Sequence, residues 1–104
     1  MMPRRDLISG AYELPVTDDD MSPRYRLGER MLVNPDVRPR AGDDVLLSRD
    51  MGSGRRATMV RRLVKATATA WHVRRLDESR QPETLDRSQW AKVELIVGAI
   101  NARR

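Results

Sequence analysis

The chain has no cysteine, no phenylalanine and one histidine in 104 residues, and aromatic side chains make up only 4% of it. Without cysteine it can form no disulfide and use no thiolate chemistry. Zinc in proteins is held by several His or Cys ligands, so the lone His72 argues against a zinc site. The scarcity of aromatics means that aliphatic side chains and methionine must fill the core. We expect no metal and no cofactor.

Long apolar segments are also missing. No run of 18 apolar residues occurs, which excludes a membrane-spanning helix. The start of the chain, residues 1–7, has no apolar core of the kind that a secretion signal needs. These absences predict a cytoplasmic protein with no membrane partner. A length of 104 residues is enough for one small domain with a modest core.

Charge is unevenly distributed along the sequence. Residues 1–50 hold 8 basic and 10 acidic side chains, a net charge of −2, whereas residues 51–104 hold 12 and 5, a net charge of +7. A basic half can attract nucleic acid or an acidic protein. Basic side chains scattered over a solvated surface produce the same composition, so charge alone leaves nucleic-acid binding as an alternative.

Short apolar segments separated by glycine, proline and asparagine predict a mainly β fold with little helix. Residues 50–55 have the glycine-rich composition of a hairpin connection. Residues 21–27 could coil briefly, and residues 77–89, with Pro82, have the composition of an irregular loop. Residues 1–15 form a polar lead with a short extended piece near residues 11–14. The expected strands are residues 30–34, 44–49, 58–65, 70–76 and 92–100.

Residues 16–35, VTDDDMSPRYRLGERMLVNP, resemble the active-site segment of the S24 peptidase family, the self-cleaving C-terminal domains of LexA and phage repressors. In that family a serine nucleophile precedes the methionine, and Asp20 stands at that position here, before Met21. The family's lysine base lies in a strand similar to residues 59–63, MVRRL, where Arg61 takes its place. Further matching segments are residues 27–29, 40–45, 71–73 and 97–100.

The resemblance implies a twisted, β-clip-like and partly barrel-shaped β assembly, as in LexA and signal peptidases, over residues 16–104. Repressors of this kind carry a helix-turn-helix reader of DNA before this domain. Residues 1–15 are too few for such a reader. We therefore expect a lead segment and one S24-like domain, with no helix-turn-helix domain.

Both catalytic positions carry side chains unsuited to the family's reaction. A carboxylate is a poor nucleophile toward an amide, and arginine stays protonated and cannot act as a base. Ser22 lies two residues beyond Asp20, roughly 6–7 Å along an extended chain, and Lys65 lies about 13 Å beyond Arg61 along a strand. We expect no catalytic residue and a remnant site made of Asp19, Met21, Ser22 and Pro23.

Opposite charges at the two altered positions favour an ion pair. If the S24-like arrangement holds, the Asp20 carboxylate and the Arg61 guanidinium lie within contact distance and form a charge-assisted hydrogen bond. A divalent cation held by Asp18, Asp19 and Asp20 is a weaker reading, since nearby arginines compete for those carboxylates. Trp71 and Trp90 are expected to be core or rim packing residues, and His72 an ordinary surface or half-buried residue rather than a titrating switch.

These observations favour a non-catalytic S24-like domain that acts as a dimerisation or protein-interaction module. Its expected partners are a second copy of itself, or a full-length repressor of the LexA or CI type, in transcription regulation and in a prophage setting. DNA would be met only indirectly. The apolar last strand predicts the dimer interface, at Ile96, Val97, Gly98 and Ile100. The alternatives are a self-cleaving S24 serine peptidase and a small basic nucleic-acid-binding protein.

Overall fold

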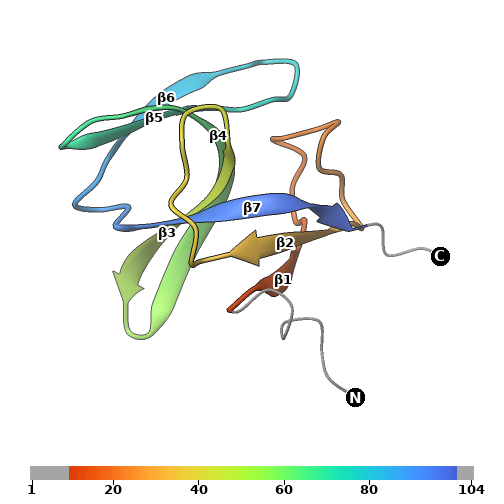
Figure 1. Ribbon diagram of the computed structural model, residues 1–104, viewed down its shortest axis with the longest axis horizontal. Helices are drawn as coiled ribbons and strands as arrows, with labels where there is room; N and C mark the ends of the chain where they lie inside the picture. Colours follow the sequence, from red (N-terminus) through yellow and green to blue (C-terminus); the bar gives the residue numbers. More distant parts are fainter. Residues whose placement is uncertain (1–9, 101–104) are drawn as a thin grey trace.

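The computed structural model of the protein describes residues 10–100, which form one antiparallel sheet of seven strands and no helix. No described segment is therefore a helix of the length and hydropathy of a membrane span. The strand order is β1-β2-β7-β3-β4-β5-β6, and the edge strands β1 and β6 do not pair, so the sheet is not closed into a barrel (Figure 1). The strands are β1 (Tyr12–Pro15), β2 (Arg30–Asn34), β3 (Asp44–Gly52), β4 (Arg55–Ala66), β5 (Ala70–Arg74), β6 (Pro82–Asp86) and β7 (Lys92–Ile100).

The predicted mainly β fold is confirmed, and β2 and β7 have the predicted bounds. The hairpin between β3 and β4 turns where glycines were noted, with Gly52, Ser53 and Gly54 all at positive φ. Glycine adopts such angles without steric cost. Residues 21–27 form turns rather than a helix. The extended piece expected in the lead is β1, which pairs with β2, while residues 1–9 of that lead and residues 101–104 lie outside the described part.

The prediction of an irregular loop over residues 77–89 is wrong, because β6 lies within it and pairs with β5 from Ala70↔Asp86 to Arg74↔Pro82. Leu85 is the only large apolar residue of β6, so the sequence alternation was too weak to indicate a strand. Pro82 is tolerated because β6 is an edge strand and begins there.

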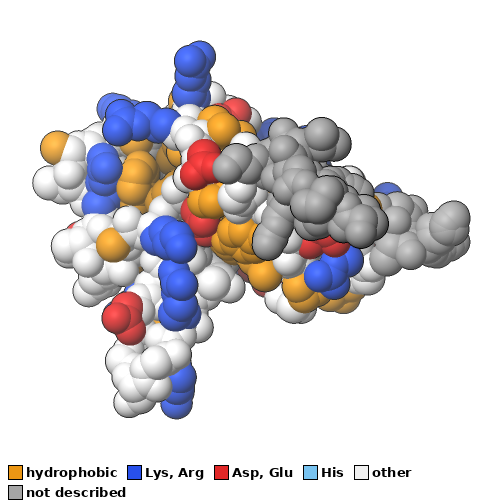
Figure 2. Space-filling view, turned by 60° about the horizontal axis from the view of Figure 1, so that its bottom comes forward, with side chains coloured by type: hydrophobic (Ala, Val, Ile, Leu, Met, Phe, Trp, Pro, Cys, Tyr) orange, Lys and Arg blue, Asp and Glu red, His pale blue; other side chains and the backbone are white. Residues whose placement is uncertain are grey.

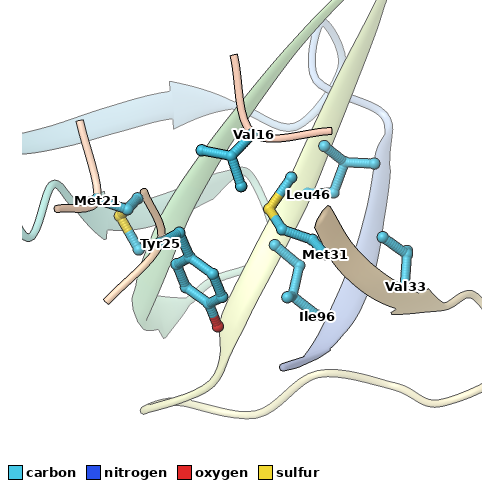
Figure 3. Close-up of a cluster of buried hydrophobic side chains, with 7 residues drawn as sticks. All are labelled: Val16, Met21, Tyr25, Met31, Val33, Leu46 and Ile96. Atoms are coloured by element: carbon cyan, nitrogen blue, oxygen red, sulfur yellow. The ribbon is translucent and has the colours of Figure 1, made fainter. Parts of the chain in front are cut away.

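The central strand β3 separates two apolar clusters. Its first five residues are all buried, and alternate side chains of a strand point to opposite faces. Leu46 belongs to one cluster, whereas Val45 and Leu47 belong to the other. The first cluster joins the segment between β1 and β2 to β2, β3 and β7 (Figure 3); its members are Val16, Met21, Tyr25, Met31, Val33, Leu46 and Ile96. The second contains Val45, Leu47, Leu63, Val73 and Trp90.

The long strand β4 connects the two ends of the molecule. It pairs with β3 through Arg62 and with β5 from Arg62 onward, with a register shift between Leu63 and Lys65. It therefore carries the β5–β6 hairpin away from β1 and β2 (Figure 1). Arg61 lies near the middle of this arrangement, opposite the fully buried Val45.

The last strand, β7, is internal rather than an edge, since it pairs with both β2 and β3. A bulge leaves Val97 without a partner in β2: Val33 is opposite Ile96, and Leu32 is opposite Gly98. A bulge of one residue reverses the faces beyond it, so Gly98 and Ile100 share the face of Leu32, opposite to that of Val33. The placement of Ile96 in a dimer interface is wrong, because its side chain is 4% exposed and packs in the first cluster.

Candidate functional site

The segment from Val16 to Glu29 places Asp20 at the edge of the first cluster. A hydrogen bond from the Val16 amide to the Glu29 carbonyl closes the segment at 2.9 Å. Met21 and Tyr25 are 2% and 1% exposed, so burial of these two side chains pins the turn against the sheet. Asp20, next to Met21, is only half-buried and points its carboxylate toward neighbouring arginines.

The backbone of Asp20 is bound as firmly as its side chain. Its carbonyl accepts hydrogen bonds from the amides of Leu76 (3.1 Å) and Asp77 (2.9 Å), just beyond β5. These bonds join the turn to a segment more than fifty residues further along the chain. These bonds fix the backbone of Asp20 beside the segment after β5, and the ion pairs with Arg61 and Arg75 hold its carboxylate.

The predicted ion pair between Asp20 and Arg61 is confirmed. The Arg61 Nη1 lies 3.2 Å from the Asp20 Oδ2, and the two side chains are 7% and 24% exposed. Arg61 also donates from Nε to the Glu83 Oε1 at 2.5 Å and from Nη1 to the Val60 carbonyl at 2.8 Å. A nearly buried guanidinium thus has acceptors on two sides, which offsets the cost of removing its charge from water.

A second arginine completes this group. Arg75 Nη2 lies 2.8 Å from the Asp20 Oδ1 and 2.6 Å from the Asp77 Oδ2. The pKa of Asp77 lies below its usual value, first because Ser79 donates to it and also because Arg75 does. We call Asp20, Arg61, Arg75, Asp77 and Glu83 the charge network.

Sequence reasoning identified Asp20 and Arg61 but missed the other three members of the charge network. Glu83 was hidden because β6 was not recognised, and its register opposite Val73 brings it near β4. Arg75 and Asp77 follow β5 directly. The sequence did indicate that Arg75 and Asp77 follow a strand, β5. Only the fold shows that the turn with Asp20 contacts the segment after β5.

The remaining members of the predicted remnant site do not form a catalytic arrangement. Met21 is in the core, whereas Asp19 and Pro23 are exposed and Ser22 is half-buried. Ser22 donates from its backbone amide to the Asp19 carbonyl at 3.0 Å, closing the turn. Asp19, Ser22 and Pro23 line an open hollow together with Leu76, Asp77, Glu78 and Arg80.

The sequence analysis also considered Lys65, His72, Trp71 and Trp90, and the structure shows where each of them lies. Lys65 is exposed on β4 opposite His72. His72 Nδ1 is 3.3 Å from the Thr84 hydroxyl, and the Trp71 Nε1 donates to the Trp90 carbonyl at 2.8 Å. Residues 10–100 contain no group of three or more His, Cys, Asp or Glu side chains that could hold a metal ion.

A second charged group lies under the same turn. The Asp44 side chain is 3% exposed and accepts from Arg24 Nε (2.7 Å), the Tyr25 hydroxyl (2.6 Å) and Arg62 Nε (2.9 Å). Burial raises the pKa of Asp44, but the donors Arg62, Tyr25 and Arg24 outweigh it, so the pKa is lowered overall. Burial, with the bond to Asp44, raises the pKa of the Tyr25 phenol above its usual value. Asp44 therefore holds the turn to β3 and β4 as an anion.

The charge network consists of three carboxylates and two guanidinium groups joined by ion pairs. Each guanidinium contacts two carboxylates, with Asp20 shared between them, and guanidinium groups do not release a proton near neutral pH. An apolar cavity of about 170 Å³ adjoins it, bounded by Leu14, Val16, Met21, Met31 and Val60 among others. Comparison with protein-family models, curated proteins and solved structures gave no match to the chain.

Proposed function

We propose that the protein is a non-catalytic, S24-like interaction module that forms a homodimer and can pair with a full-length repressor of the LexA or CI type. The observation that carries the proposal is the ion pair of Asp20 with Arg61. It stands where the resembling family has a serine and a neutral lysine, and it leaves a rigid scaffold without a nucleophile or a base.

The rigidity of the charge network supports a binding role. Arg61 contacts both Asp20 and Glu83, so β4, β6 and the turn after β1 are held together by one side chain. A general base at this site would have to be released from such ion pairs before it could accept a proton from a substrate. The network is therefore better suited to fixing the shape of a surface than to proton transfer.

The surface proposed for the homodimer is the outer face of β7 and β2. Val97 is 48% exposed, Gly98 and Ile100 are half-buried, and the bulge places the last two on the face of Leu32. These apolar residues share the face with the Arg30–Glu13 ion pair, and together they can bury further surface against a second copy. We define this dimer face by Leu32, Val97, Gly98 and Ile100.

The oligomeric state tests the dimer. Light scattering after size-exclusion chromatography should give twice the chain mass for the wild type and the single chain mass for Val97→Glu. The matched control is Val64→Glu, because Val64 is exposed to a similar extent, 51%, but lies on β4. A monomeric wild type at about 100 µM, or equal behaviour of the two variants, would contradict the proposed dimer.

A separate experiment tests the absence of catalysis. The purified protein is incubated at alkaline pH and its mass is followed, beside the Ser22→Ala variant. We expect an intact chain in both samples, since Ser22 lies outside the charge network. A fragment cut near Gly10 that disappears in Ser22→Ala would establish a peptidase instead.

A further inference from the structure

Five arginines line one open hollow of about 430 Å³ beside the turn that carries Asp20. Pro23 and Leu76 complete its wall, and the basic residues are Arg24, Arg26, Arg62, Arg74 and Arg80. They come from the turn after β1, from β4 and β5, and from the turn closed by the hydrogen bond between the Arg80 amide and the Asp77 carbonyl at 3.0 Å. We call this the arginine hollow.

Only part of this charge is balanced within the described residues. Arg24 and Arg62 both bind the buried Asp44, at 2.7 and 2.9 Å. For Arg26, Arg74 and Arg80, no carboxylate of residues 10–100 lies within 4.0 Å of the guanidinium. The lining of the hollow itself therefore carries an excess of positive charge, and the acidic side chains Asp19, Asp77 and Glu78 lie in the adjoining hollow, which shares Pro23, Leu76 and Arg80 with it.

The register of the sheet places two of these arginines directly opposite each other, and one of the two, Arg62, is also opposite Asp44. Arg62 of β4 is directly opposite Arg74 of β5. Like charges at directly opposed positions destabilise a sheet, and Asp44 already shares its two oxygens among Arg24, Arg62 and Tyr25. An anion seated between Arg74 and the exposed Arg26 and Arg80 would remove that repulsion.

We propose that the arginine hollow binds the phosphate groups of a nucleic acid strand. Guanidinium groups bind phosphate oxygens in a fork geometry, and several of them around one depression can hold successive phosphates. Pro23 and Leu76 supply an apolar wall against which a sugar or base can pack. The hollow is open and three of its arginines are exposed, which suits a strand that passes across the surface more than an enclosed small ion.

The whole-molecule charge favours the same ligand. The net charge of the sequence is +5, and Figure 2 shows Lys and Arg side chains spread over one face, with Asp and Glu side chains at several places among them. Such a field attracts a long polyanion from a distance, whereas a single phosphate ion gains little from it. A nucleic acid strand would therefore gain binding free energy both from the arginine hollow and from the net positive charge of the protein.

Fluorescence anisotropy with a labelled 20-nucleotide single strand and the matching duplex tests the proposal at 50 and 200 mM salt. Binding should weaken steeply with salt. The Arg74→Gln/Arg80→Gln variant should bind about tenfold more weakly, with a salt slope reduced by about 2. The control is Arg55→Gln/Arg56→Gln, which removes the same charge from two exposed positions on β4; it should bind within about threefold of the wild type.

Three results would overturn the proposal. Equal weakening in both double variants would assign binding to net charge rather than to the hollow. Binding of pyrophosphate, measured directly by isothermal titration calorimetry, with no binding of either oligonucleotide would assign the hollow to a small free anion. Binding of polyglutamate as tight as that of the oligonucleotides would show that the surface binds any polyanion. Thermal unfolding of each variant, expected to be unchanged or slightly raised for Arg74→Gln/Arg80→Gln, verifies that the folded protein is being compared.

Discussion

At the scale of single residues, arginine side chains form the ion pairs that neutralise the buried and half-buried aspartates. Two half-buried or buried aspartates, Asp20 and Asp44, each accept from two arginines. A planar guanidinium can donate to more than one carboxylate at once, which lysine does less well. The charge network and the Asp44 group therefore hold the same turn from two sides.

Removing either member of the Asp20–Arg61 pair should destabilise the fold. Arg61→Met leaves Glu83 without its short bond and should lower the free energy of unfolding by about 2–3 kcal/mol. Asp20→Asn should cost about 1–2 kcal/mol, because Arg61 and Arg75 each lose one charged partner while Arg61 keeps Glu83 and Arg75 keeps Asp77. The double variant should show a coupling energy of about 1 kcal/mol in urea unfolding. Strict additivity would mean that the two groups do not interact in solution.

Asp44 should make stability depend on acid pH. Its pKa in the folded protein is lowered, so the ionised carboxylate stabilises the fold above the unfolded value of about 3.9. That contribution is lost as the pH falls through the folded pKa. Asp44→Asn should cost about 3 kcal/mol at pH 7, and its deficit against the wild type should shrink below about pH 4.

The control for this pH dependence is Asp19→Asn, since Asp19 is exposed. Its unfolding free energy should remain within about 0.5 kcal/mol of the wild type at every pH. Urea unfolding between pH 3 and pH 8 measures both variants. A constant deficit for Asp44→Asn across that range would show that its ionisation does not contribute to stability.

At the scale of elements, the bulge in β7 divides one apolar strand into core and surface. Residues 96–100 are all apolar, so their sequence does not indicate which side chains face the core. Ile96 faces the core because it is opposite the buried Val33, and the bulge at Val97 then places Gly98 and Ile100 on the face of Leu32. Ile96 becomes core, and Val97 becomes surface.

Neighbouring truncations in β7 should therefore differ in their effect on stability. Ile96→Ala removes a buried side chain and leaves a cavity, which should cost about 3 kcal/mol. Val97→Ala changes a half-exposed side chain and should cost under about 1 kcal/mol. Chemical denaturation at low protein concentration measures both without a contribution from self-association. Equal losses would mean that the bulge lies elsewhere in the strand.

At the scale of the whole molecule, β3 couples the two apolar clusters. Leu46 contacts one cluster and its neighbours Val45 and Leu47 contact the other, so neither cluster can lose β3 without the other. We expect one cooperative unfolding transition, as for most small domains. Trp90 lies in the second cluster and the half-buried Trp71 packs against it, so their fluorescence reports on that cluster alone.

Leu46→Ala tests this coupling, because it alters only the first cluster directly. It should lower stability by about 2–4 kcal/mol, and the tryptophan fluorescence transition should shift together with the circular dichroism transition. Val73→Ala, a matched truncation in the second cluster, should shift both signals in the same way. A tryptophan transition that is unchanged in Leu46→Ala would show two independently folding halves.

The sequence by itself determined the mainly β fold, several strand bounds and the chemistry of positions 20 and 61. Strand alternation and glycine-rich turns are local properties, so they can be read without knowing which strands are neighbours. The opposite charges of Asp20 and Arg61 are equally plain from the residues. Their pairing followed once a spatial arrangement was assumed.

Only the tertiary structure decided which distant residues complete these groups. Arg75 and Glu83 join Asp20 and Arg61, and Arg74 meets Arg62, because β4 pairs with β5 and β5 with β6 in one register. The same holds for the inward orientation of Ile96, which follows from its register opposite the buried Val33, and for the outward orientation of Gly98 and Ile100, which follows from the bulge at Val97. Which strands pair depends on long-range contacts that bury both clusters together, so no local pattern of residues predicts it.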